Sequence, residues 1–331
     1  DSLIISGFND RIFIISGSVN VTINAVSLIN GFNSGPGGAI VNMGGTLNVT
    51  RSTFSNNTSL TSGGAVANTI GTVNVSNSTF NNNHSSFGGA IGSFSGGTVT
   101  VTNSTFSGNS ADINGGAIVN DGTVDVTNTT FSDNTASLNG GAIANIGILN
   151  ILRCRFINNS AANSGGAVAN IARTTTITNS TFSDNHANFG GAIGNFSSGT
   201  VDISNSTLSN NSAAKSGGAF VNDGTVTIIR CTFTGNSASG DGGAFANDGT
   251  ASIMFSTFTG NSADFSGGAI VNFSPGTVTI ANSTFTGNSA LNGGAIANFS
   301  FNAITITRST FSGNSIPAIV GPVVITNSTI S

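Results

Sequence analysis

The chain has 331 residues, a net charge of −4 and only 6% charged residues. This balance argues against a nucleic-acid-binding surface or a polybasic membrane patch. No apolar run reaches the roughly 18 residues that span a bilayer, so we expect no transmembrane segment. Glycine (46 residues), Asn, Ser and Thr dominate beside Ile, Val, Ala and 24 Phe. Because the β-branched and aromatic residues recur in register, ordered β-structure is favoured over disorder.

One pattern repeats along nearly the whole chain. Each copy has an aromatic residue, usually Phe, followed three residues later by Asn, as in Phe106 and Asn109. A regular period of this length is typical of a repeat array in which one unit stacks on the next. The tripeptide Gly-Gly-Ala marks the copies eleven times, 25 to 27 residues apart, beginning at Gly37, Gly63, Gly88, Gly115, Gly140, Gly165, Gly190, Gly217, Gly242, Gly267 and Gly293.

The repeat divides the chain into three consecutive stretches. Residues 1–36 contain short apolar runs without Gly-Gly-Ala and are interpreted as degenerate N-terminal rungs. Residues 37–314 hold the regular repeats, and residues 315–331 are interpreted as an atypical C-terminal rung. No internal boundary separates these stretches, so we predict a single β-helix domain over residues 1–331.

A single rung can be followed in residues 88–111. Residues 90–93 are expected to form a short strand, residues 98–102 alternate Thr with Val as a half-buried strand does, and residues 105–107 form a third strand. Three strands and three bends in about 25 residues predict an all-β parallel β-helix, or β-solenoid, of about 12 to 13 rungs. Leucine-rich, nonapeptide calcium-binding, propeller and helical repeats do not fit the composition, motif or period.

Stacking turns each repeated position into a column along the solenoid. Asn amides in one column can donate and accept along a ladder, and stacked rings can fill the interior. The predicted asparagine ladder is Asn57, Asn83, Asn109, Asn134, Asn159, Asn185, Asn211, Asn236, Asn261, Asn288 and Asn314. The predicted aromatic stack, which Leu208 interrupts, is Phe54, Phe80, Phe106, Phe131, Phe156, Phe182, Phe233, Phe258, Phe285 and Phe311.

The short strand after Gly-Gly carries a further pattern. The residue after Ala is large and apolar in every copy, as at Ile91, so we expect it to face the core. Alternation would point Ala and the small residue two positions later outward, as a flat apolar face of about 400 Å². The alternative is that terminal segments or an adjacent turn cover this column. The candidate association face is Ala90, Ala117, Ala142, Ala167 and Ala192.

Residues with reactive chemistry are few. The chain has no Glu, and its twelve Asp are mostly scattered. Asp223 and Asp248 form the best pair, because each lies in Asn-Asp-Gly after a strand and the two are expected on neighbouring rungs about 4.8 Å apart. Turn formation is the favoured reading of Asn-Asp-Gly, a weak calcium site comes second and catalysis third. We therefore expect no enzyme activity, no catalytic residue, no metal centre and no cofactor.

Two cysteines, Cys154 and Cys231, occupy the same column three repeats apart. At about 4.8 Å per rung their separation is roughly 14 Å, beyond the limit of about 7 Å between the Cα atoms of a disulfide. We expect both side chains to be reduced thiols.

The two short motifs resemble a known family. Gly-Gly-Ala-Ile, as at Gly88, and Phe-x-x-Asn, as at Phe106, are similar to the repeats of the chlamydial polymorphic outer-membrane proteins and of related bacterial surface proteins, from roughly Gly37 to Asn314. The resemblance implies a right-handed parallel β-helix that is exported, often as an adhesive passenger held at the cell surface. It brings no catalytic residues with it.

We predict an extracellular or cell-surface structural or adhesive solenoid that associates with itself, end to end or laterally, into a filament or surface layer. The alternative is a monomeric adhesin or autotransporter-type passenger stalk that binds a receptor or glycan. A polysaccharide-active or ice-binding β-helix is the third reading. The expected partners are other copies of the chain, surface proteins or glycans, and not nucleic acid.

Overall fold

The computed structural model describes residues 3–196 and 198–331, which form an all-β parallel β-solenoid of about 12 turns with about 26 residues per turn. That part of the chain contains no helix, and it confirms the predicted fold class. The chain divides into two compact units. Unit 1 comprises Asp1–Ala162 and Ala167–Ala169, and unit 2 comprises Asn163–Gly166 and Asn170–Ser331. The single domain over residues 1–331 stays a prediction.

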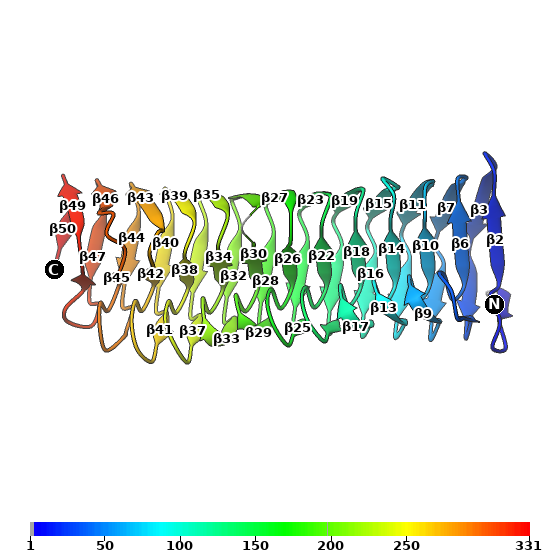
Figure 1. Cartoon of the computed structure of the whole chain (residues 1–331), viewed down its shortest axis with the longest axis horizontal. Helices are drawn as coiled ribbons and strands as arrows, with labels where there is room; N and C mark the ends of the chain where they lie inside the picture. Colours follow the sequence, from blue (N-terminus) through cyan, green and yellow to red (C-terminus); the bar gives the residue numbers. More distant parts are fainter. Residues whose placement is uncertain (1–2, 197) are drawn as a thin grey trace. The chain divides into compact units, whose positions relative to one another are not determined.

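Unit 1 contains strands of four parallel sheets, here called A to D (Figure 1). Sheet A holds β1 (Leu3–Ser6), β4 (Val26–Ile29), β8 (Thr53–Ser55), β12 (Thr79–Asn81), β16 (Thr105–Ser107), β20 (Thr130–Ser132) and β24 (Arg155–Ile157). Sheet B holds β2 (Phe13–Ser16), β6 (Ile40–Met43), β10 (Val66–Asn68), β14 (Ile91–Ser93), β18 (Ile118–Asn120) and β22 (Ile143–Asn145). Sheet C holds β3 (Asn20–Asn24), β7 (Thr46–Thr50), β11 (Thr72–Ser76), β15 (Thr98–Thr102), β19 (Thr123–Thr127) and β23 (Ile148–Leu152). Sheet D holds β5 (Phe32–Asn33), β9 (Thr58–Ser62), β13 (His84–Phe87), β17 (Ser110–Asn114), β21 (Thr135–Ala136) and β25 (Ser160–Ala161).

Unit 2 has the same arrangement, and β26 (Val168–Asn170) has residues in both units. Its sheet A holds β28 (Thr181–Ser183), β32 (Thr207–Ser209), β36 (Thr232–Thr234), β40 (Thr257–Thr259), β44 (Thr284–Thr286), β47 (Thr310–Ser312) and β50 (Thr329–Ile330). Sheet B holds β30 (Ile193–Asn195), β34 (Phe220–Asn222), β38 (Phe245–Asn247), β42 (Ile270–Asn272), β45 (Ile296–Asn298) and β48 (Ile319–Val320). Sheet C holds β27 (Arg173–Thr178), β31 (Gly199–Ser204), β35 (Thr225–Ile229), β39 (Thr250–Met254), β43 (Thr277–Ala281), β46 (Ile304–Thr307) and β49 (Val323–Thr326). Sheet D holds β29 (His186–Phe189), β33 (Ser212–Ser216), β37 (Ser237–Ala238) and β41 (Ser262–Ala263).

Sheet D is an addition to the predicted rung. The three expected strands correspond to sheets B, C and A, but most turns form a fourth strand between the asparagine ladder and Gly-Gly. This strand is short, and its register shifts between Ser85 and Phe87 in β13. The prediction of three strands per rung is therefore too low.

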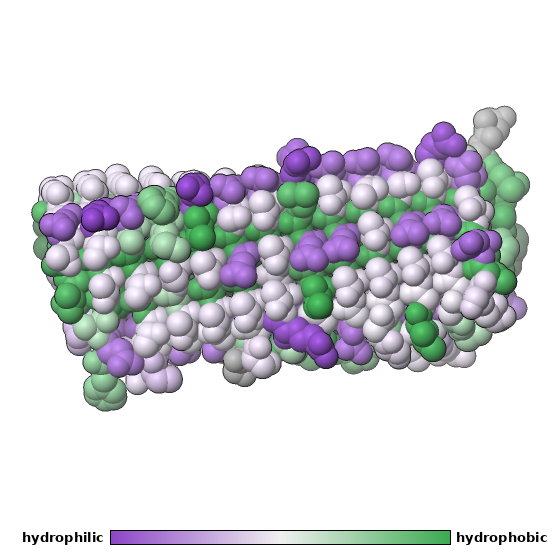
Figure 2. Space-filling model, turned by 90° about the horizontal axis from the view of Figure 1, so that it is seen from above, coloured by the Kyte–Doolittle hydropathy of each residue, from purple (hydrophilic) through white to green (hydrophobic). Residues whose placement is uncertain are grey.

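The interior is built from the predicted columns. Val99 and Val101 of sheet C and the ring of Phe106 are fully buried. In unit 1 the rings of Phe54 and Phe80 stack with centroids 4.7 Å apart, and the same contact continues along the column. Figure 2 shows that one outer face consists mainly of pale, weakly polar residues, as expected for a chain with 6% charged residues.

The asparagine ladder forms within each unit. The side-chain amide of Asn109 donates to the backbone oxygen of Phe80 at 3.0 Å and to Oδ1 of Asn134 at 2.9 Å. Its own Oδ1 accepts from the backbone and side-chain nitrogens of Asn83, both at 3.0 Å. Every polar atom of this buried side chain is thus satisfied, which explains why Asn is repeated here.

The alanine column lies at a corner and not on an outward face, so the predicted association face is wrong. The sheet B strands begin only after the alanine, as β18 does at Ile118. The backbone N–H groups of Ala117 and Ile118 both donate to the oxygen of Ala142 at 2.9 Å. The alanine therefore precedes the extended segment, and the alternation from which the outward direction was predicted does not reach it. The five residues of the predicted association face have no exposed surface: Ala90, Ala117, Ala142, Ala167 and Ala192.

Candidate functional site

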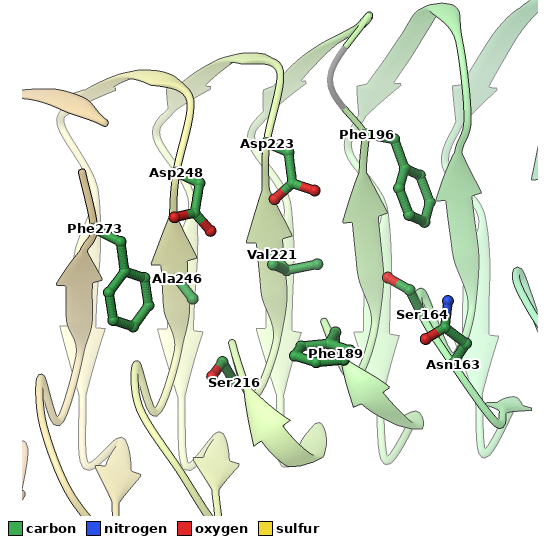
Figure 3. Close-up of a pocket in the computed structure, with 10 residues that line it drawn as sticks. All are labelled: Asn163, Ser164, Phe189, Phe196, Ser216, Val221, Asp223, Ala246, Asp248 and Phe273. Carbon is green, nitrogen blue, oxygen red and sulfur yellow. The ribbon is translucent and has the colours of Figure 1, made fainter. Parts of the chain in front are cut away.

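Unit 2 contains a recess of about 350 Å³ on the outer side of sheet B. Side chains from several successive turns converge on it (Figure 3). Some belong to sheet B and the turns that follow its strands, and the others belong to sheet D and the segment before Gly-Gly. The lining residues are Asn163, Ser164, Phe189, Phe196, Ser216, Val221, Asp223, Ala246, Asp248 and Phe273.

The floor is made of small sheet B residues. Val221 of β34 pairs with Ala246 of β38 on one side and with Gly194 of β30 on the other. A Cβ atom at Gly194 would overlap Oγ of Ser164 unless the serine side chain rotated away, so glycine leaves this part of the floor open with Ser164 in place. These are members of the small column that the sequence predicted to face outward. The column does reach the outer side here, but as the floor of a recess and not as a flat face.

One wall is a row of four side chains from consecutive turns, here called the acidic row: Phe196, Asp223, Asp248 and Phe273. Each directly follows the asparagine that ends a sheet B strand. Backbone hydrogen bonds between turns fix the spacing of these residues. The backbone N–H of Asp223 donates to the oxygen of Asn195, and that of Asp248 donates to the oxygen of Asn222, both at 2.8 Å. The two carboxylates therefore stand side by side with a phenylalanine on each flank.

The carboxylates of the acidic row lack compensating partners. Among the described residues, neither Asp223 nor Asp248 accepts a side-chain hydrogen bond or forms an ion pair. The pKa of Asp223 is raised, first by desolvation and then by the negative charge of Asp248. Desolvation also raises the pKa of Asp248. Asp223 remains accessible at the mouth of the recess, and Asp248 is half-buried.

Opposite the acidic row, Ser164 provides an unpaired hydroxyl. The residue is only 2% exposed, and its Oγ has no hydrogen-bond partner among the described residues. Figure 3 shows this oxygen directed toward Val221 and the interior of the recess. Buried hydroxyls are almost always satisfied, so an unsatisfied one that points into a cavity marks a place where a water or ligand atom can bind.

Five segments match the Chlamydia polymorphic membrane protein repeat: residues 51–69, 103–121, 128–146, 153–171 and 230–248. These five segments are similar to that repeat. This confirms the resemblance seen in the two short motifs. Proteins with these repeats are typically non-enzymatic surface proteins, and the repeat suggests a location at the outer membrane or cell surface. No curated protein and no solved structure matches the chain.

Each matched polymorphic membrane protein repeat ends at the column position of the acidic row. That position is Thr69, Asp121, Ile146, Ile171 and Asp248 in the five matched segments. The repeat therefore fixes the scaffold and leaves this outward position variable, as expected where loop residues carry binding specificity.

Unit 1 contains a related arrangement with one carboxylate. Phe87 and Phe94 flank the same Gly-Gly-Ala-Ile-Gly sequence that Phe189 and Phe196 flank in unit 2. The next two residues of the column are Asp121 and Ile146, where unit 2 has Asp223 and Asp248. A Cβ atom added at Gly92 would meet the ring of Phe94 first, whereas at Gly194 it would meet Oγ of Ser164. The ring of Phe94 therefore occupies the space over the floor that stays open in unit 2.

The sequence found only part of this site. Asp223 and Asp248 were predicted to lie on neighbouring rungs. The pairing of Asn222 with Asn247, the residues that precede them, confirms this. The sequence missed Ser164 and the three phenylalanines, although Phe-Gly-Gly-Ala-Ile-Gly-x-Phe is a visible signal in the chain. No group of three or more metal-ligating side chains occurs in the described part of the chain. The calcium reading of the Asp pair stays a prediction.

Two further predictions concerned the cysteines and membrane-spanning segments. Cys154 and Cys231 are buried thiols, and burial raises the pKa of each to about 11. Residues 3–196 and 198–331 include no helix with the length and hydrophobicity needed to cross a bilayer.

Proposed function

We propose that the chain is a non-enzymatic, surface-displayed passenger whose repeats form a rigid scaffold for the recess in unit 2. The observation that carries the proposal is the combination of a regular, hydrogen-bonded core with an outward recess in which, among the described residues, Asp223 and Asp248 have no ion-pair partner and the Ser164 hydroxyl has no hydrogen-bond partner. The polymorphic membrane protein repeat supports display at the surface. Binding through a recess corresponds to the passenger alternative drawn from the sequence.

Self-association has less support. Its lateral form relied on the alanine column, whose members are fully buried. End-to-end association stays a prediction, and light scattering over a concentration series would detect it as a mass that rises with concentration.

Surface display can be tested on cells that produce the full chain. An antibody against the solenoid should label intact cells as strongly as permeabilised ones, while a cytoplasmic marker should be labelled only after permeabilisation. Labelling of the solenoid only in permeabilised cells would overturn the proposal. Turnover of an acidic polysaccharide by the purified chain, lost in an Asp223→Asn variant, would overturn its non-enzymatic part.

A further inference from the structure

The acidic row holds two negative charges that the protein does not neutralise. Its carboxylates are neighbours, are partly desolvated and have no ion-pair partner among the described residues. Two adjacent carboxylates in a partly dry site favour either a bound proton or a bound cation. The charged groups on the sheet D side are Lys215 and Asp241, which neighbour Ser216 in the chain and across a β-bridge. Neither is paired with the acidic row.

The rest of the lining favours an organic cation over a bare metal ion. Phe196 and Phe273 flank the carboxylates, and Phe189 lies on the opposite wall. Aromatic faces attract ammonium and guanidinium groups and give little to a small hydrated ion such as calcium, which takes six to eight oxygen ligands. The chain itself shows the contact, because Nζ of Lys215 lies 5.0 Å from the ring centroid of Phe189.

The size of the recess limits what can enter. A volume of about 350 Å³ is at the lower end of the range of roughly 300–1,000 Å³ found for small-molecule sites. It fits one side-chain-sized group and not a chain of several sugars. Ser164 Oγ offers one further hydrogen bond at the floor, where an N–H donor of such a group can reach it.

From these features we infer that the recess binds an organic cation, the ammonium or guanidinium of a Lys or Arg side chain on a partner polypeptide. The carboxylates of Asp223 and Asp248 accept its N–H groups, and the phenylalanine rings contact its aliphatic stem and charged end. The hydroxyl of Ser164 accepts one more N–H. This inference rests on the proposed function only for the biological setting, since binding to the purified chain does not depend on surface display.

The test uses the full purified chain and two small probes, N-acetyl-lysine methylamide and N-acetyl-arginine methylamide. Saturation-transfer NMR titrations would measure their affinity, with N-acetyl-norleucine methylamide as a neutral probe of similar shape. We expect at least one cationic probe to bind at least tenfold more tightly than the neutral one. Equal affinity for the neutral probe, or no binding of any probe, would overturn the inference.

Matched variants locate the site. Changing Asp223→Asn and Asp248→Asn together should weaken cation binding at least tenfold, because both charges are lost while the side-chain shapes remain. Asp121→Asn is the control, since Asp121 lies in the same Asn-Asp-Gly sequence in unit 1 beside Ile146. It should leave binding unchanged. Equal loss in the control, or retained binding in the double variant, would contradict the assignment; circular dichroism would verify that each variant is folded.

Competition and pH separate the cation from other ligands. Affinity should fall on acidification, with a midpoint above the ordinary Asp value of about 3.9, because a proton competes with the cation for the carboxylates. Lys215→Gln should strengthen binding of the charged probes by removing a nearby positive charge, and should not change the neutral one. Displacement of the probe by millimolar calcium or by neutral monosaccharides would overturn the inference in favour of a metal or glycan site.

Discussion

Polar side chains in this solenoid fall into two groups, which Asn109 and Asp223 represent. Asn109 is buried, and both of its side-chain polar atoms are bonded to neighbouring turns. Asp223 has no such partner, and desolvation raises its pKa. The sequence could distinguish them in principle, since a ladder needs the same residue in every turn whereas Asp occurs in only two consecutive turns here. A group left unsatisfied by an otherwise regular fold is where binding is to be sought.

The raised pKa values predict a pH-dependent stability. Because the native state holds its protons on Asp223 and Asp248 to a higher pH than the unfolded chain does, it binds more protons in that interval and stability falls as the pH rises through it. Asp248→Asn should therefore raise the free energy of unfolding at pH 7, by less than about 1 kcal/mol because solvent screens a half-exposed group. Urea unfolding at pH 7 and pH 3 would measure this. A gain that is as large at pH 3 would contradict the electrostatic cause.

At the level of strands and turns, regularity decided what the sequence could predict. The strands of sheets B, C and A carry apolar residues that repeat from turn to turn. The sequence predicted a strand at all three places. Sheet D was missed because it has little apolar alternation, a shifting register and as few as two residues, as in β21. Its signal is the buried small residue two positions after the ladder asparagine, such as Ala111 and Ala136. The wrong direction of the alanine column arose at the same corner, because the sheet B strand begins only after the alanine and alternation does not reach it.

Gly-Gly at that corner predicts a large effect of a single methyl group. A Cβ at Gly243 would collide with backbone oxygens of Gly268 and Ser262, which cannot move without opening the next turn. Gly243→Ala should cost more than about 4 kcal/mol in urea unfolding, well above an ordinary substitution. Gly260→Asn is the control: Gly260 has φ +61° and open space around it, and Asn210 adopts φ 54° at the equivalent position. A similar loss in both variants would show that backbone freedom and not the collision is the cause.

At the scale of the whole molecule, the fold and the resemblance to a repeat family could be predicted from the period and the two motifs, because both recur in nearly every turn. The recess could not, because it depends on Gly194, Ser164 and the acidic row, which come from different turns and occupy column positions whose residue type varies from turn to turn. A solenoid built in this way can change one outward position without changing its core. That independence makes the scaffold suitable for display and leaves binding to a few non-repeated residues.

The two thiols allow the stability of each unit to be measured separately. Cys154 is in unit 1 and Cys231 in unit 2, and each has a pKa of about 11, so only about one thousandth of either is thiolate at pH 8. We expect both to resist iodoacetamide in the native protein and to react once urea unfolds their surroundings. Because each turn of a solenoid depends mainly on its neighbours, Gly243→Ala should shift the labelling of Cys231 to lower urea more than that of Cys154. Peptide mass spectrometry would report both sites in one sample, and equal shifts would show that the chain unfolds as one cooperative block.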